Sequence, residues 1–181
     1  MSTETEVKIR IDDLDDFCSR LNTLGPRILS EKHFEDNFLL DFEDGSLKAS
    51  RRLVRIRHAR GVACLTFKGP PEPEGLFKTR EELEIKLEDG EIALHIFERL
   101  GMRVWFRYQK YRREFALGEI HVAVDETPVG NYAEFEGSKE GIRALAREMG
   151  IEESQFLRQS YYSLYLEYCR ATGDSPCDMI Y

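Results

Sequence analysis

The segment Glu4-Thr5-Glu6-Val7-Lys8-Ile9-Arg10-Ile11 alternates strictly along its length. An alternation with a period of two residues is typical of a β-strand that has two unlike faces. One face carries Val7, Ile9 and Ile11, and the other face is charged. This segment therefore predicts a strand with an apolar side that needs cover and a charged side that needs a partner.

The same alternation returns along the chain and predicts further extended segments. They cover residues 33–41, 53–57, 62–68, 79–87, 105–116, 119–125 and 132–136. Glycines at turn positions, such as Gly61 and Gly118, join several of these segments over short distances. Short connections of this kind indicate hairpins, so most of the sheet is expected to be antiparallel.

Amphipathic helices are predicted between the groups of strands. Their predicted starting points are Asp12 or Asp13 for the first helix, Asp89-Gly90 for the second, Ser138 for the third and residue 152 for the fourth, which runs to 170. This order predicts a single α+β domain over residues 1–170, with the helices packed outside the sheet. The tail, 171–181, contains Gly and Pro and is expected to be flexible.

Charge gathers on the polar faces of the strands, at i, i+2 spacing and separated by sign. The acids are Glu4, Glu6, Glu82, Glu84, Glu134 and Glu136, with Asp125 at the end of a strand, and the bases are Lys8, Arg55, Arg57, Lys68, Lys110 and Arg112. Such a face can simply meet water, with ion pairs across the strands. If the sheet closes into a barrel, the same face lines the lumen. Carboxylates facing arginine and lysine suit a polyanion with a bound divalent metal, because carboxylates hold Mg²⁺ or Mn²⁺ and the bases hold phosphate oxygens.

The overall composition argues against several functional classes. The formal net charge of the 181 residues is −8, which is unlike a general nucleic-acid binder or a membrane-surface binder. No apolar run approaches the roughly 20 residues that a membrane span needs. The four cysteines lack zinc-site spacing and are typical of free thiols in a reducing cytoplasm.

Short charged motifs follow one another along nearly the whole chain. They are Glu4-Thr5-Glu6-Val7-Lys8, Arg55-Ile56-Arg57, Thr66-Phe67-Lys68-Gly69-Pro70, Lys78-Thr79-Arg80-Glu81-Glu82, Lys110-Tyr111-Arg112-Arg113, Asp125, residues 130–136 and Ser160-Tyr161. This ordered set resembles the CYTH superfamily, the triphosphate tunnel metalloenzymes, and is closest to its CyaB-like branch of class IV adenylyl cyclases and thiamine-triphosphatases. The resemblance implies an eight-stranded antiparallel β-barrel with helices packed outside. It also implies a triphosphate-containing small molecule as ligand and Mg²⁺ or Mn²⁺ as cofactor.

The resemblance further implies roles for individual residues. The implied metal ligands are Glu4, Glu6, Glu134 and Glu136. The implied phosphate-binding residues are Lys8, Arg55, Arg57, Lys68, Arg80, Lys110 and Arg112. The implied catalytic residues are Lys8, Glu82, Glu84 and Asp125, of which the two glutamates hold a second metal or orient water. We expect Tyr111 and Arg113 to lie outside the lumen, and Tyr161 to pack the last helix against its rim.

Three functions are compatible with this inventory. The first is metal-dependent hydrolysis of tripolyphosphate, a nucleoside triphosphate or thiamine triphosphate. The second is a class IV adenylyl cyclase, although the His-Phe pair that such cyclases carry before the ExExK motif does not precede Glu4 here. The third is a module that binds polyphosphate or nucleotide without turnover. The expected location is the cytoplasm, and a homodimer remains an alternative to a monomer.

Overall fold

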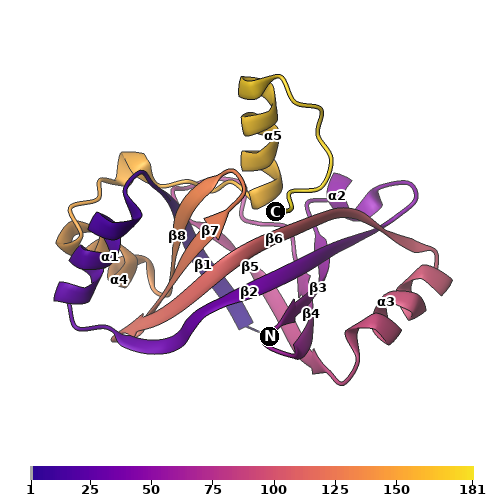
Figure 1. Cartoon of the computed structure of the whole chain (residues 1–181), viewed down its shortest axis with the longest axis horizontal. Helices are drawn as coiled ribbons and strands as arrows, with labels where there is room; N and C mark the ends of the chain where they lie inside the picture. Colours follow the sequence, from indigo (N-terminus) through magenta and orange to yellow (C-terminus); the bar gives the residue numbers. More distant parts are fainter. Residues whose placement is uncertain (1) are drawn as a thin grey trace.

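The computed structural model describes residues 2–181, and its strands close into a barrel (Figure 1). The order around the barrel is β1-β5-β4-β3-β2-β6-β7-β8, and every neighbouring pair is antiparallel. The strands are β1 (Ser2–Ile11), β2 (Arg27–Phe42), β3 (Leu53–Ala59), β4 (Val62–Lys68), β5 (Lys78–Leu87), β6 (Met102–Leu117), β7 (Ile120–Thr127) and β8 (Gly130–Glu136). The predicted α+β fold with an eight-stranded antiparallel barrel is confirmed.

Strand β1 closes the barrel between β5 and β8. Glu4 lies opposite Arg80 of β5, and Lys8 lies opposite Glu134 of β8. Side chains that lie directly opposite each other on antiparallel strands share one face of the sheet. The register therefore brings acids of one strand beside bases of the next.

The largest apolar core lies outside the barrel, against β1, β7 and β8. Two helices, α1 (Leu14–Thr23) and α4 (Lys139–Glu148), cover this outer face (Figure 1). Val7 of β1 and Phe135 of β8 have no exposed surface there. Full burial of such a side chain contributes about 2 kcal/mol to stability. Because the apolar faces turn outward to the helices, the charged faces turn into the lumen.

The predicted N-caps are present at three helices. Asp13 before α1, Asp89 before α3 (Gly90–Arg99) and Ser138 before α4 each accept a hydrogen bond from the backbone N–H three residues later. A cap of this kind contributes about 1 kcal/mol. Within the described residues 2–181, none of the helices has the length and apolar character that a membrane crossing needs.

The prediction of one helix over residues 152–170 is wrong. The chain first makes a short 3₁₀ turn, η1 (Glu153–Gln155), and Leu157 then pairs with Lys8 of β1 through two backbone hydrogen bonds of 2.9 and 2.8 Å. Strand pairing extends the backbone, so α5 (Tyr161–Thr172) begins only after it. The sequence periodicity does not reveal this pairing. The pairing is made by backbone N–H and C=O groups of Lys8 and Leu157, whereas periodicity reports only on side chains.

Helix α5 stands across one end of the barrel (Figure 1). Its residues Leu164 and Tyr165 are buried against Leu39 of β2 and Phe106 of β6. Strand β6 extends past β7 at this end, and α5 covers apolar residues that β2 and β6 present there. The helix thus positions its first residues at the rim of the lumen.

The C-terminal residues fold back on β6, where the sequence predicts a flexible tail. The backbone N–H of Gln109 donates to Met179, and that of Met179 donates to Arg107, at 2.9 and 3.0 Å. Strand β7 pairs with β6 only from Tyr111 onward, so the preceding edge of β6 is available to the tail. Met179 is only 1% exposed, and its burial explains why this segment docks.

Candidate active site

The lumen holds a cavity of about 820 Å³ that extends to α5 and to the segment before β3. The charged faces of the strands line it, as the alternation predicts. The predicted site residues on its wall are Glu4, Glu6, Lys8, Arg55, Arg57, Lys68, Arg80, Glu82, Glu84, Lys110, Arg112, Glu134 and Glu136. Asp125 is fully buried and contacts two of them, Lys110 and Arg112. The described wall does not include Tyr111 or Arg113.

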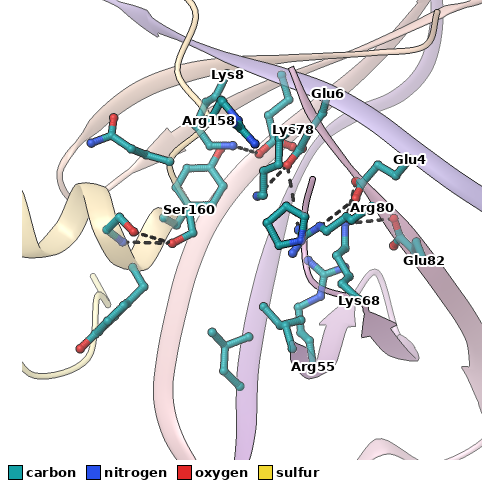
Figure 2. Close-up of a pocket in the computed structure, with 18 of the residues that line it drawn as sticks. Glu4, Glu6, Lys8, Arg55, Lys68, Lys78, Arg80, Glu82, Arg158 and Ser160 are labelled. Carbon is teal, nitrogen blue, oxygen red and sulfur yellow. Dashed lines mark hydrogen bonds and ion pairs between the residues drawn. The ribbon is translucent and has the colours of Figure 1, made fainter. Parts of the chain in front are cut away.

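Three carboxylates, from β1, β5 and β8, lie near one another at one end of the lumen. They belong to Glu4, Glu82 and Glu136, and we call this end of the lumen the acidic end. The ammonium of Lys68 lies 2.6 Å from Glu4 and 3.0 Å from Glu82 (Figure 2). Burial, and next the negative charge of Glu4, raises the pKa of Glu136 to about 7. Burial is thus the main reason that Glu136 resists ionisation, and the charge of Glu4 adds to it.

Glu6 lies between this end and the middle of the lumen. Its carboxylate is 2.9 Å from the ammonium of Lys78. Burial opposes its ionisation, but the ammonium groups of Lys78 and Lys8 lower the pKa of Glu6 below its ordinary value. Lys78 continues the inward series of Arg80 and Glu82 on β5, although the sequence motif that contains it predicts no role for it.

Glu134 lies among cations instead. The ammonium of Lys8 is 2.6 Å from one of its oxygens, and the guanidinium of Arg112 is 2.5 Å from the other. Burial opposes ionisation here too, yet Lys8 and then Arg112 hold the pKa of Glu134 well below its ordinary value. The four predicted metal ligands therefore occupy two different electrostatic surroundings.

Asp125 is the centre of a buried network that we call the basic end. Its carboxylate accepts hydrogen bonds from Arg112 at 2.7 and 2.6 Å and from Lys110 at 3.0 Å. The hydroxyl of Tyr161, the first residue of α5, also donates to it. Burial and the charge of Asp125 raise the pKa of Tyr161 well above its ordinary value, so the phenol stays protonated. The sequence predicts a packing role for Tyr161 and misses this hydrogen bond.

Glu35 of β2 is a second residue that the sequence analysis misses. It is 2% exposed, and it lies 3.4 Å from Arg57 and 3.6 Å from Lys110. Burial opposes its ionisation, but Lys110 and then Arg112 hold the pKa of Glu35 well below its ordinary value. The apolar Leu39 follows on the same face of β2 and obscures the charge alternation that marks the other strands.

Glu84 of β5 forms ion pairs with Arg55 and Arg57 of β3. It accepts a hydrogen bond from Thr66 at 2.7 Å, and the guanidinium of Arg57 lies 3.3 Å away. The guanidinium of Arg55 also donates to Thr66 at 3.2 Å. The side chain of Glu84 is 35% exposed, so it is more accessible to water than Glu82, the other inward-facing acid on β5.

His121 also lies on the cavity wall. Its imidazole is 3.3 Å from Glu114 and 3.9 Å from Glu136. His121 and Asp125 are four residues apart on β7 and therefore share one face of that strand. It is close enough to influence the acidic end without itself belonging to the carboxylate cluster.

A divalent cation fits the acidic end by charge and by ligand type. Hard cations such as Mg²⁺ take carboxylate oxygens, and Glu4, Glu82 and Glu136 bring three carboxylates to this end of the lumen. Within residues 2–181, no three acidic, histidine or cysteine side chains are already arranged to coordinate an ion. Glu4 and Glu6 instead form ion pairs with Lys68 and Lys78.

A closed antiparallel barrel with paired acids and bases along its lumen defines a charged-tunnel class of protein. Comparison with protein-family models makes the assignment specific. The model of the CYTH domain matches residues 2–162, so the chain belongs to the CYTH domain family. Proteins of this family generally depend on divalent metals.

Individual relatives are similar over most of their length. A protein of Methanocaldococcus jannaschii, named as a candidate adenylate cyclase, is 28% identical over 89% of this chain and 97% of its own. The adenylate cyclase CyaB of Aeromonas hydrophila is 25% identical over 89% and 87%. A solved structure from Hippeastrum, described as a candidate adenylyl cyclase with a dominant triphosphatase activity, superposes with a TM-score of 0.67 at 18% identity, over 96% and 97%.

Proposed function

We propose that this chain is a metal-dependent hydrolase that cleaves the terminal phosphoanhydride bond of a triphosphate held in the lumen. The observation that carries the proposal is the concentration of cations on one cavity wall. They are Lys8, Arg55, Arg57, Lys68, Lys78, Arg80, Lys110 and Arg112. A triphosphate presents a linear series of charged oxygens, which arginine and lysine bind strongly where water is largely excluded.

The basic end holds phosphate oxygens. Arg112 and Lys110 are fixed by Asp125, so their positions are set before the substrate arrives. Lys8 shares its ammonium with Glu134 and can turn to a phosphate oxygen at the same end. Fixed charges of this kind stabilise a phosphoryl-transfer transition state without reorganising as the reaction proceeds.

The acidic end would hold the metal, through Glu4, Glu82 and Glu136, with Glu6 adjacent. Lys68 then exchanges its contact with Glu4 for a phosphate oxygen. A divalent cation bound there supplies Lewis-acid polarisation of the phosphate. Glu134 is also implied as a metal ligand by the family resemblance, but its cationic neighbours favour a role in fixing Lys8 and Arg112.

The partly exposed carboxylate of Glu84 is our candidate for orienting the attacking water. Its contact with Thr66 fixes one oxygen, and its exposure leaves it accessible from the cavity. In the proposed reaction, the water oxygen forms a bond to the terminal phosphorus while the bond from that phosphorus to the bridging oxygen breaks. The bridging oxygen keeps the electron pair, and orthophosphate is released.

A cyclase is the second candidate, because two relatives carry adenylate cyclase in their names. Two observations favour hydrolysis. The Hippeastrum structure of the same fold is described by its triphosphatase activity. In addition, the ammonium of Lys48 lies over the rings of Trp105 and Tyr162 on the cavity wall, so an adenine that stacks on the same face of either ring has to displace Lys48.

Product analysis separates these activities. Purified protein is incubated with ATP or tripolyphosphate, with Mg²⁺ and then Mn²⁺, and the products are resolved by ion chromatography. We expect orthophosphate and pyrophosphate from tripolyphosphate, and no cyclic AMP from ATP. Cyclic AMP with pyrophosphate from ATP would make the chain a cyclase. Binding of tripolyphosphate without any product would favour the non-catalytic module.

A further inference from the structure

The end of the cavity beside α2 (Ser46–Ala49) is lined by basic side chains, whereas the bases in the lumen form ion pairs with acids. Lys48, Arg51 and Arg52 are exposed and line the same cavity as the lumen residues. Arg158, in the segment before α5, also lines this cavity, and its guanidinium donates to backbone carbonyl oxygens of the loop that precedes β5. Among the described residues that α2, the turn after it and segment 158–163 contribute to the wall, none is acidic. We call this part of the cavity the basic mouth.

The basic mouth is built on a fixed backbone. Asp41, at the end of β2 and 2% exposed, accepts hydrogen bonds from the backbone N–H groups of Leu47 and Lys48, both at 2.9 Å. Arg51 has a φ of 59°, a left-handed conformation that is costly for a residue with a side chain, and its N–H closes the turn onto Lys48 at 3.0 Å. A buried carboxylate and a tight turn thus fix the backbone that carries the three cations.

Aromatic side chains fix the first of these cations. The ammonium of Lys48 lies 4.4 Å from the ring centre of Trp105 and 4.3 Å from that of Tyr162, and it donates to the hydroxyl of Tyr162 at 3.0 Å. Trp105 packs against the apolar cluster beneath α5 and also lines the mouth. Lys48 thus places positive charge over one face of each ring.

We propose that the basic mouth binds the phosphates of a linear inorganic polyphosphate beyond the three that lie in the lumen. This inference rests on the proposed function. A polyphosphate continues with one negative charge per added phosphate, so a chain held by its terminal triphosphate brings charge to Lys48, Arg51 and Arg52. Arginine pairs suit phosphate oxygens. A nucleoside or thiamine at the same position would place an uncharged or cationic group against these cations.

The first test is binding to metal-free protein, so that turnover does not interfere. Tripolyphosphate and a longer linear polyphosphate are titrated into the whole chain in EDTA, at low ionic strength, by calorimetry. We expect the longer chain to bind about tenfold more tightly per molecule, the effect of a few exposed charge contacts. In Arg51→Gln/Arg52→Gln this advantage should disappear, while tripolyphosphate affinity stays unchanged.

The control variant is Arg99→Gln/Arg170→Gln, which removes the same charge from exposed positions off the cavity wall. It should keep the full advantage of the longer chain. Thermal melting shows whether each variant is folded. Equal affinities for the two phosphates in the wild-type chain, or an advantage that survives in Arg51→Gln/Arg52→Gln, would overturn the inference.

The proposed function fails in a different way. If tripolyphosphate does not bind, or binds equally well to Arg55→Gln/Lys110→Met, the lumen is not the triphosphate site and both proposals fall. If tripolyphosphate binds in the lumen and is hydrolysed, but chain length has no effect, only the inference about the mouth is wrong. Tighter binding of ATP than of the longer polyphosphate would show that the mouth receives a nucleoside.

Discussion

The phenol of Tyr161 donates a hydrogen bond to Asp125, whose side chain has no exposed surface. The same carboxylate accepts hydrogen bonds from Lys110 and Arg112. The first residue of α5 is thus connected through one buried acid to two cations of the lumen. The helix at the end of the barrel therefore contributes to the geometry of the basic end as well as to the apolar core.

The first prediction concerns this contact. Tyr161→Phe keeps the ring, over which the ammonium groups of Lys8 and Lys110 lie at 4.6 and 4.8 Å, and removes only the hydroxyl. Loss of a hydrogen bond to a buried charged acceptor should lower the free energy of unfolding by about 2 kcal/mol. Tripolyphosphate affinity should fall as well, because Asp125 loses one of the groups that fix its position and so holds Lys110 and Arg112 less precisely. Urea unfolding and calorimetry measure the two effects.

The control for this prediction is Tyr162→Phe, which loses a hydroxyl whose hydrogen-bond partner, within residues 2–181, is the exposed Lys48. Its free energy of unfolding should change by less than about 1 kcal/mol. Equal effects of the two substitutions on stability would mean that the Tyr161 hydroxyl is unimportant to the network.

The second prediction compares two arginines on opposite sides of the barrel wall. Arg57 lies in the lumen with Glu35 and Glu84, whereas Arg113 is not part of the described wall. Arg57→Ala should weaken tripolyphosphate binding about tenfold or more, since it removes a charge from a water-poor site. Arg113→Ala should leave binding unchanged. Calorimetric titrations that gave the same loss for both would contradict the inward and outward assignment.

The third prediction addresses the metal. Glu4→Gln removes one charge of the acidic end while keeping the size of the side chain. We expect Mn²⁺ affinity to fall and metal-dependent turnover to drop by about a hundredfold or more. Glu140→Gln, an exposed residue of α4, is the matched control and should behave as wild type. Near-normal Mn²⁺ binding by Glu4→Gln, measured by electron paramagnetic resonance, would remove Glu4 from the set of ligands.

The fourth prediction concerns His33 of β2, which lies beside Glu35. Its imidazole lies 3.5 Å from Glu35, and that hydrogen bond raises its pKa above the ordinary value although burial opposes the shift. Protonated His33 therefore stabilises the fold below its unfolded pKa of about 6.5, and this contribution is lost as the pH rises through the folded pKa. Melting temperatures of wild type and His33→Gln, measured from pH 5 to 9, should converge as the pH rises. A constant difference would contradict this assignment.

Much of the barrel follows from the sequence, because period-two alternation is visible in residues such as Val7 and Lys8. The alternation states which side chains share a face, and the apolar face must pack against helices. The inward face of β1 is therefore predictable without knowledge of its neighbours. The capping residues Asp13, Asp89 and Ser138 are likewise local features, each acting on an N–H three positions away.

The remainder depends on register and on contacts between distant segments. Glu134 and Glu136 are equivalent in the sequence, yet Lys8 and Arg112 reach only the first, and the second lies with Glu4. No pattern in the chain predicts which carboxylate meets which cation. Docking of Met179 on β6 is similar, because it depends on the point at which β7 stops pairing. The metal ligands, the homodimer and the cytoplasmic location stay predictions.

The most direct test of the central claim is a metal titration of orthophosphate release from tripolyphosphate. The wild-type chain is assayed in EDTA and then with increasing Mg²⁺ or Mn²⁺, beside Lys110→Met. We predict no release in EDTA, release that saturates with metal, equal amounts of orthophosphate and pyrophosphate, and a large loss in Lys110→Met. Release that is independent of metal, or undiminished in Lys110→Met, would contradict the assignment of this lumen as a metal-dependent triphosphatase site.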